Sequence, residues 1–222
     1  MMKKIFIPLT VVTAAMFAYA PYAINNVALE STMLLVQKIF YFHFATWMAM
    51  TLAIAVCGLA SLAYLFMGSK VADWYAAASA ELVVVFGIFG LFSGCLWGRK
   101  AWGVWWQWDA RVTMATMIVL VFLGYLIVRK YGGPGSEKLS AAMGIFGAAT
   151  APFVYKSVDW WRTIHPQTSV MTTLGDKFPG AWRVVWFCSF AFLFLTVLLL
   201  FARVRLEAMR SELDRMYLAA ED

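Results

Sequence analysis

The chain has 222 residues, of which 63% are hydrophobic and 14% are charged, and its mean hydropathy is +0.75. Soluble domains are about 45–50% apolar, so this composition excludes an ordinary soluble protein and indicates an integral membrane protein. The net charge of +6 does not point to nucleic acid, because the 18 Lys and Arg residues lie mostly between apolar runs and in the C-terminal tail, where they indicate membrane topology.

Six apolar runs are candidates for membrane-spanning helices, each of which needs roughly 20 residues. They cover residues 5–24, 39–66, 75–96, 114–128, 139–155 and 183–202. The first run also resembles a secretory signal, because Ala18-Tyr19-Ala20 has the small-x-small pattern of a cleavage site. The fifth run is the weakest, since it is short, rich in Gly and Ala, and interrupted by Pro152. We expect an all-α fold with a single six-helix membrane domain over residues 1–222.

The C-terminal tail, residues 203–222, is predicted to form a cytoplasmic amphipathic helix. Its apolar residues recur at spacings of three and four: Leu206, Met209, Leu213 and Met216. This face can dock a partner, or it can lie on the lipid headgroups. The pattern alone leaves both interpretations open.

The stretch between the third and fourth runs, residues 97–113, reads WGRKAWGVWWQWDARVT and is expected to form a loop. It contains five of the eleven tryptophans: Trp97, Trp102, Trp105, Trp106 and Trp108. Indole rings can stack on a flat ring system while nearby cations, here Arg99, Lys100 and Arg111, receive acidic substituents. Haem has that shape. The alternatives are an aromatic belt at the membrane interface and cations that reach the headgroups.

Alternate loops of a six-span protein lie on the same side, so the loops after the first, third and fifth runs share one compartment. That side receives ten of the eleven tryptophans, all but Trp74, whereas a belt would populate both faces. It also receives His43, at the start of the second run, and His165, in the polar loop 156–181. The opposite side has ten cations against eight, which favours cytoplasmic termini.

His43 and His165 are the only histidines in the chain. Two are enough for a six-coordinate haem, because the porphyrin leaves one axial position on each face, but they are too few for an ordinary zinc site without carboxylates. Asp109 is expected to cap the following helix or to contact the ligand, and the two roles are compatible. Glu81, an acid within a span, is interpreted as a contact between helices or with a partner. No GxxxxGK[ST] loop for nucleotide hydrolysis occurs.

The pattern WGxxxWGxWWxWDxRxT, complete from Trp97 to Thr113, resembles the tryptophan-rich "WWD" signature of the haem-handling proteins of cytochrome c biogenesis. The length, the six spans and the one histidine on each side of the signature are similar to the family of cytochrome c maturation protein C (CcmC), the haem exporters. The resemblance covers nearly the whole chain. The cytochrome c haem lyases carry the same signature on many more spans, so the length argues against them.

This resemblance implies a haem-delivery protein of the bacterial inner membrane rather than a classical enzyme. It implies that haem b lies at the periplasmic face against the five tryptophans, with contacts from Asp109, Arg99 and Arg111 and with iron held by His43 and His165. The implied partners are the periplasmic haem chaperone CcmE, the ABC-type subunits CcmA and CcmB, which would hydrolyse ATP, and the small subunit CcmD.

Two other functions compete with haem delivery. A bis-histidine haem anchor for electron transfer in a respiratory complex needs its histidines deep in facing helices. A transporter or channel with a polar path across the bilayer needs several charges within the spans, and Glu81 is the one that qualifies.

Overall fold

The computed structural model describes residues 2–29, 34–168 and 179–221, and these contain helices but no β-strand. The elements are α1 (Met2–Asn25), η1 (Leu34–Val36), α2 (Gln37–Met67), α3 (Lys70–Ala101), α4 (Ala110–Tyr131), α5 (Ser136–Trp160) and α7 (Pro179–Glu221). The expected all-α class is confirmed, and each predicted run lies within one long helix. Residues 169–178 of the predicted loop 156–181, and the last residue of the tail, lie outside the described residues.

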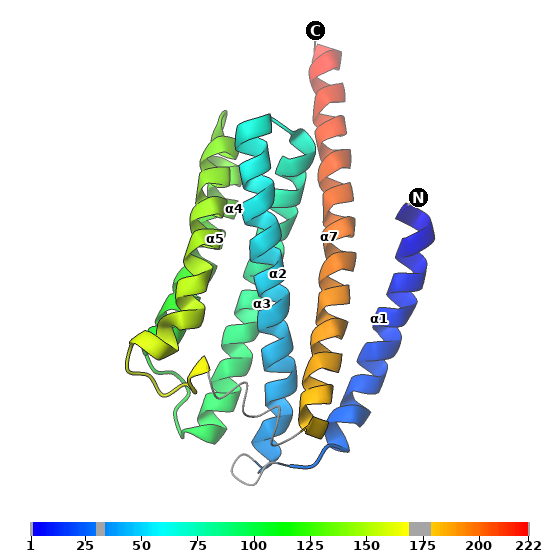
Figure 1. The fold of residues 1–222 in the computed structure, drawn as a ribbon. Helices are drawn as coiled ribbons and strands as arrows, with labels where there is room; N and C mark the ends of the chain where they lie inside the picture. Colours follow the sequence, from blue (N-terminus) through cyan, green and yellow to red (C-terminus); the bar gives the residue numbers. More distant parts are fainter. Residues whose placement is uncertain (1, 30–33, 169–178, 222) are drawn as a thin grey trace.

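The long helices run alternately up and down, as Figure 1 shows. Helices α2, α3, α4 and α5 form a bundle, α7 packs along α2 and α3, and α1 packs mainly on α7. Both chain ends lie at one end of the molecule, which we call the terminal end. The described residues that follow α1, α3 and α5, namely 26–29, 102–109 and 161–168, lie at the opposite end, which we call the loop end. The compartment that each end faces stays a prediction.

Five of the described helices are long and apolar enough to cross a membrane: α1, α2 together with η1, α3, α4 and α7. Helix α5, predicted as the weakest span, is not among them by hydropathy, although its 25 residues pack against α4 and α2. The first four spans and the last therefore agree with the sequence. A transmembrane role for α5 stays a prediction that rests on its place in the bundle.

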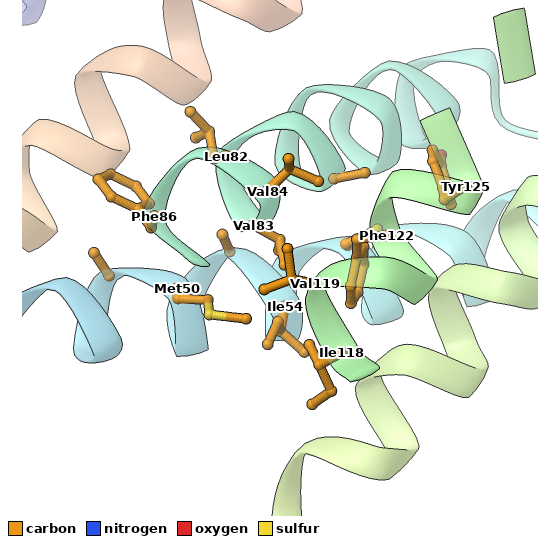
Figure 2. Close-up of a cluster of buried hydrophobic side chains, with 14 of the residues drawn as sticks. Met50, Ile54, Leu82, Val83, Val84, Phe86, Ile118, Val119, Phe122 and Tyr125 are labelled. Carbon is orange, nitrogen blue, oxygen red and sulfur yellow. The ribbon is translucent and has the colours of Figure 1, made fainter. Parts of the chain in front are cut away.

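Small residues let the helices approach closely. A Cβ added to Gly144 of α5 would lie 2.6 Å from the Ser61 hydroxyl oxygen on α2, and one added to Gly147 would lie 2.6 Å from the ring of Phe122 on α4. The glycines that make α5 weakly hydrophobic thus serve helix packing. Figure 2 shows the neighbouring core between α2, α3 and α4, with these side chains labelled: Met50, Ile54, Leu82, Val83, Val84, Phe86, Ile118, Val119, Phe122 and Tyr125.

Two ion pairs join helices in the half of the bundle toward the terminal end. Arg129 of α4 donates from both terminal nitrogens to the two carboxylate oxygens of Asp73 on α3, at 2.5–2.6 Å. Arg203 of α7 donates to both carboxylate oxygens of Glu81 on α3. Planar two-point pairing of this kind fixes orientation as well as distance. The helix-contact interpretation of Glu81 is confirmed.

The start of the predicted loop is wrong, and the last span and the tail, predicted as two segments, are continuous in the structure. Helix α3 continues to Ala101, so Trp97 is helical and the loop expected over residues 97–113 is reduced to 102–109. The peptide N–H of Trp102 donates to the Gly98 carbonyl at 2.8 Å and closes the last turn of α3. The last span and the tail also form one unbroken helix, α7, because no Gly or Pro interrupts residues 181–221.

Candidate functional site

Asp109 occupies the start of α4 and joins it to the loop after α5. Its Oδ1 accepts a hydrogen bond from the peptide N–H of Val112 at 2.9 Å, so the predicted N-cap is confirmed. Its Oδ2 accepts hydrogen bonds from the Thr163 hydroxyl and from Nδ1 of His165, the latter at 2.8 Å. With 4% of the Asp109 side chain exposed, the carboxylate is shielded from solvent, and both of its oxygens accept hydrogen bonds.

The contact with Asp109 fixes the orientation and tautomer of His165. Burial raises the pKa of the Asp109 carboxyl, but hydrogen bonds from Thr163, Val112 and His165 outweigh it and hold the pKa below its usual value. An ionised carboxylate has no proton to give, so Nδ1 of His165 carries the proton of that hydrogen bond. Burial is the main reason that the pKa of His165 lies below its usual value, against the opposing effect of Asp109. The neutral ring therefore presents the lone pair of Nε2.

Trp97 and Trp102 form the inner part of the tryptophan stretch. Their rings meet edge to face with centroids 4.6 Å apart, and Trp102 meets the ring of His165 in the same way at 4.9 Å. Gly98 makes room for this stack, since an added Cβ would lie 3.3 Å from the Val104 carbonyl oxygen and 3.6 Å from the Trp102 ring. The loop is thus packed so that an indole lies directly against His165.

Trp105, Trp106 and Trp108 form the outer part, with 60%, 37% and 69% of their surfaces exposed. Trp106 and Trp108 pack edge to face at 5.0 Å, and the Arg99 guanidinium lies 6.0 Å from the centre of the Trp105 ring. An open hollow of about 400 Å³ adjoins this surface, lined by Trp108, Asp109, Ala110, Thr113, Met114 and Trp161. The outer tryptophans therefore offer apolar surface at the loop end.

His43 lies on α2 and faces α3. Its Nδ1 is 2.9 Å from the hydroxyl oxygen of Ser93, which donates in turn to the Gly90 carbonyl at 3.1 Å. The indole N–H of Trp47, one turn along α2, donates to Nε2 of His43 at 3.3 Å. These roles agree when Nδ1 carries the proton and Nε2 accepts. Both histidines thus have Nδ1 held by an oxygen atom.

Glycines on one side of α3 seat these groups. An added Cβ at Gly90 would lie 2.8 Å from the Trp47 ring, and one at Gly94 would lie 3.2 Å from Cε1 of His43. Gly98 follows one turn later and borders Trp102. Successive glycines are about 6 Å apart along the helix axis. The last turns of α3 therefore place His43 and the Trp102–His165 contact near one another at the loop end.

The cations expected at the ligand are partly engaged elsewhere. Nη1 of Arg111 donates to the carbonyls of Val154 and Tyr155 at 3.2 and 3.1 Å, which ties α4 to α5. Arg99 donates to the Gly103 carbonyl at 2.6 Å, whereas Lys100 is exposed.

The sequence interpretation missed four residues that shape this region: Trp47, Ser93, Trp161 and Thr163. Only two of them carried a local signal. Trp47 follows His43 by one helical turn, and Thr163 precedes His165 by two residues in DWWRTIHP.

Comparison with known proteins identifies the family. A family model described as Heme exporter protein C matches residues 1–219. The chain is 33% identical to Heme exporter protein C of Bradyrhizobium diazoefficiens over 181 residues, which are 80% of this chain and 67% of that protein. It is 28% identical to Heme exporter protein C of Haemophilus influenzae over 188 residues (82% and 76%), and 29% identical to a putative cytochrome c biosynthesis ccmC-like mitochondrial protein of Marchantia polymorpha over 161 residues (72% and 68%). The chain therefore belongs to the heme exporter protein C (CcmC) family.

Proposed function

We propose that this protein binds haem as cargo at the loop end and delivers it for cytochrome c assembly. Membership of the heme exporter protein C family implies a role in haem export for cytochrome c biogenesis. The site-level proposal is that His43 and His165 are the axial ligands of the haem iron. It also proposes that Trp97, Trp102, Trp105, Trp106 and Trp108 contact the porphyrin.

The hydrogen bond from His165 to Asp109 is the observation that carries this proposal. Histidines that bind metals almost always donate their other ring N–H to a carboxylate, a carbonyl or water, which fixes the ring and strengthens the ligand. Here Nδ1 of His165 is 2.8 Å from a shielded carboxylate oxygen, and no described residue hydrogen-bonds its Nε2. Asp109 is in this account a positioning residue for the ligand.

His43 supports the proposal in the same way. Ser93 holds its Nδ1, and the bond from Trp47 to Nε2 is long at 3.3 Å. A small rotation of the Trp47 ring would free Nε2 for iron. Two neutral imidazoles, each presenting Nε2, supply the two axial positions that a porphyrin leaves open.

The surrounding groups fit a porphyrin with acidic substituents. The indole N–H of Trp97 is buried and has no acceptor among the described residues, so a ligand oxygen would satisfy it. The exposed rings of Trp105, Trp106 and Trp108 can cover an apolar macrocycle. Arg99 and Lys100, which lie next to the tryptophans in the sequence, are the cations that would contact the haem propionates. Arg111 and Asp109 would act indirectly, Arg111 by joining α4 to α5 and Asp109 by positioning His165.

Delivery requires that the loop end face the compartment in which haem is handed over. We propose that the loop end faces the periplasm and that the termini lie on the cytoplasmic side of an inner membrane.

The haem, as haem b, would pass to the chaperone CcmE. Because no nucleotide-binding loop occurs in the chain, ATP would be hydrolysed by CcmA and CcmB, with CcmD as the small subunit. Exposed Trp105 and Trp108 support a site open to a carrier protein.

The test is the haem content and visible spectrum of the purified protein. His43→Gly and His165→Gly should each lose most of the bound haem, whereas Trp74→Phe, at the terminal end, should retain it. Trp102→Phe, which changes the ring beside His165, should lower the haem content to an intermediate level. Unchanged haem content in both histidine variants would overturn the proposed ligation.

The orientation is tested separately by labelling cysteines in intact cells with an impermeant reagent. In a background without Cys57, Cys95 and Cys188, Lys100→Cys and Gln167→Cys should both react, and Ser211→Cys should not. Reaction of Ser211→Cys alone would reverse the proposed orientation. The electron-transfer alternative is less well supported, because His165 lies on a loop at the end of the bundle.

A further inference from the structure

The part of α7 beyond the bilayer carries an apolar face that no described residue covers. A helix of 43 residues is about 65 Å long, whereas a bilayer with its headgroups is about 40–45 Å thick. Figure 1 shows the end of α7 rising past the neighbouring helices at the terminal end. Roughly 20 Å of helix therefore projects beyond the headgroups.

The projecting segment has two different sides. Val204 is 8% exposed, and Arg203 and Glu207, which lie 3.5 Å apart, belong to the side that faces α3. The outward side carries a stripe of four residues that are 50–63% exposed: Leu206, Met209, Leu213 and Met216. Their spacing of three, four and three is the a/d pattern of a coiled-coil seam, so we call these four residues the α7 seam.

The α7 seam is flanked by charged residues at the positions that set partner choice in coiled coils. Arg205 and Arg210 border it near the membrane, and neither belongs to an ion pair among the described residues. Farther out, Glu212 lies 3.6 Å from Arg215 and is partly neutralised. The membrane-proximal flanks are therefore basic.

Lipid is a poor occupant for this seam. A surface-bound amphipathic helix lies parallel to the membrane, which requires a break after the span. Helix α7 has no Gly or Pro between residues 181 and 221, and Arg203 is fixed to Glu81 just where such a bend would occur. The seam is therefore directed away from the bilayer.

A second copy of the chain is also a poor occupant. Two copies in one membrane project their tails in the same direction, so only parallel pairing is open to them. In a parallel coiled coil, the residue that precedes an a position on one helix lies opposite the residue that follows the next d position on the other helix. Arg205 of each copy would then face Arg210 of the other, and like charges would oppose pairing.

We propose that the α7 seam docks an amphipathic helix of a partner protein that places carboxylates opposite Arg205 and Arg210. The partner helix would bury Leu206, Met209, Leu213 and Met216 and neutralise the two free arginines. This surface is at the end opposite to the haem site, so it is independent of the proposed ligation. It would couple the protein to an assembly partner on the terminal side.

The test uses the full-length protein in nanodiscs and two fluorescent synthetic helices of three heptads. Both peptides have Leu at a and d; one has Glu at all e and g positions and the other has Lys. The Glu peptide should bind roughly tenfold more tightly or better, measured by fluorescence anisotropy. Arg205→Glu combined with Arg210→Glu should reverse this order, and Leu206→Asp combined with Leu213→Asp should abolish binding of both peptides.

Ser211→Asp, on the side away from the seam, is the matched control and should leave both affinities unchanged. Circular dichroism and haem content should be unaffected in all of these variants. Three results would overturn the proposal. One is equal or absent binding of the two peptides. The second is a blue-shifted dye at Leu213→Cys in nanodiscs without peptide, which would place the seam on lipid. The third is efficient disulfide dimerisation of Met209→Cys in membranes, which would indicate a second copy.

Discussion

The two histidines of the site are held in different ways. His43 lies within a long helix and its ring is set between α2 and α3, with Ser93 as the partner of Nδ1. His165 lies on a loop, and its Nδ1 is held by the carboxylate of Asp109. A helix-borne ligand moves only with the bundle, whereas a loop-borne ligand can withdraw while the bundle stays intact. This difference fits the proposed function, in which the protein first holds haem and then releases it.

The described part of the loop that carries His165 is nevertheless anchored at two places. Asp109 accepts hydrogen bonds from Thr163 and His165 on one side. On the other, Asp159 accepts from the peptide N–H and the hydroxyl of Thr168 at 3.1 and 2.7 Å. Hydrogen bonds to Asp109 and Asp159 thus position this part of the loop, which does not pack between the helices of the bundle. His165 is therefore positioned by a few polar contacts and His43 by packing.

The largest difference between the two histidines should appear in rescue by free imidazole. In His165→Gly, added imidazole can enter beside the loop and should restore at least half of the lost haem. In His43→Gly the vacated space lies between α2 and α3, so rescue should be several-fold weaker. Haem content and the Soret band of the purified variants measure this. Equal rescue of the two variants would remove the distinction between a packed and an exchangeable ligand.

Removing the partners of Nδ1 should affect His165 more than His43. Asp109→Asn keeps an oxygen for the α4 cap but removes the charge that holds Nδ1–H, and the haem affinity should fall about 10–100-fold. Ser93→Ala removes a neutral partner, so a loss of roughly tenfold or less is expected. Haem titration of the unloaded proteins measures both affinities. Thermal unfolding is the control for loss of the helix cap; a larger effect from Ser93→Ala would contradict the comparison.

The packing on α3 gives a test that concerns His43 and leaves the His165 loop unchanged. Gly94→Ala places a Cβ 3.2 Å from Cε1 of His43, so the ring must shift by a few tenths of an ångström, and we expect a moderate loss of haem, about two- to fivefold. Gly180→Ala is the matched control, because an added Cβ there meets no atom of the described residues within 4 Å. The ratio of haem to protein measures the effect. Equal losses in the two variants would show that the contact with His43 is unimportant.

The smallest expected effect is on the titration of His165 without haem. Its pKa should lie below the ordinary value of 6.5, because burial disfavours the charged ring. Asp109→Asn should lower this pKa further, since the carboxylate raises it. Because the folded protein favours the neutral ring of His165, the free energy of unfolding is highest above pH 6.5, the pKa in the unfolded chain. This contribution to stability is lost as the pH falls through the pKa of His165 in the folded protein. Nitrogen-detected NMR of the imidazole measures it; a pKa above 6.5 would contradict the burial of the ring.

The sequence predicted the helices and the Asp109 cap, because the length of an apolar run and the identity of a capping residue are local features. It also predicted that the two histidines and most tryptophans lie at one end, because successive loops of a helical bundle alternate between its two ends. Helix ends were harder. Hydropathy falls at Trp97 and Arg203, yet helical hydrogen bonding continues through both, since polar residues do not break a helix.

The partners of the site residues could not be predicted. Ser93 is 50 residues from His43, and Asp109 is 56 residues from His165, so no local pattern connects them. Arg111 was expected at the ligand but donates to carbonyls of α5, which depends on how α4 and α5 pack. Side-chain pairing across a bundle follows from packing, which the order of residues along the chain does not reveal.

The most direct test of the central claim is electron paramagnetic resonance of the ferric haem complex. If His43 and His165 are the two axial ligands, the native protein should show a low-spin signal of a six-coordinate bis-imidazole haem. His43→Gly and His165→Gly should each convert the remaining haem to a high-spin form, and Trp74→Phe should leave the low-spin signal unchanged. A low-spin signal that persists in both histidine variants would contradict the account.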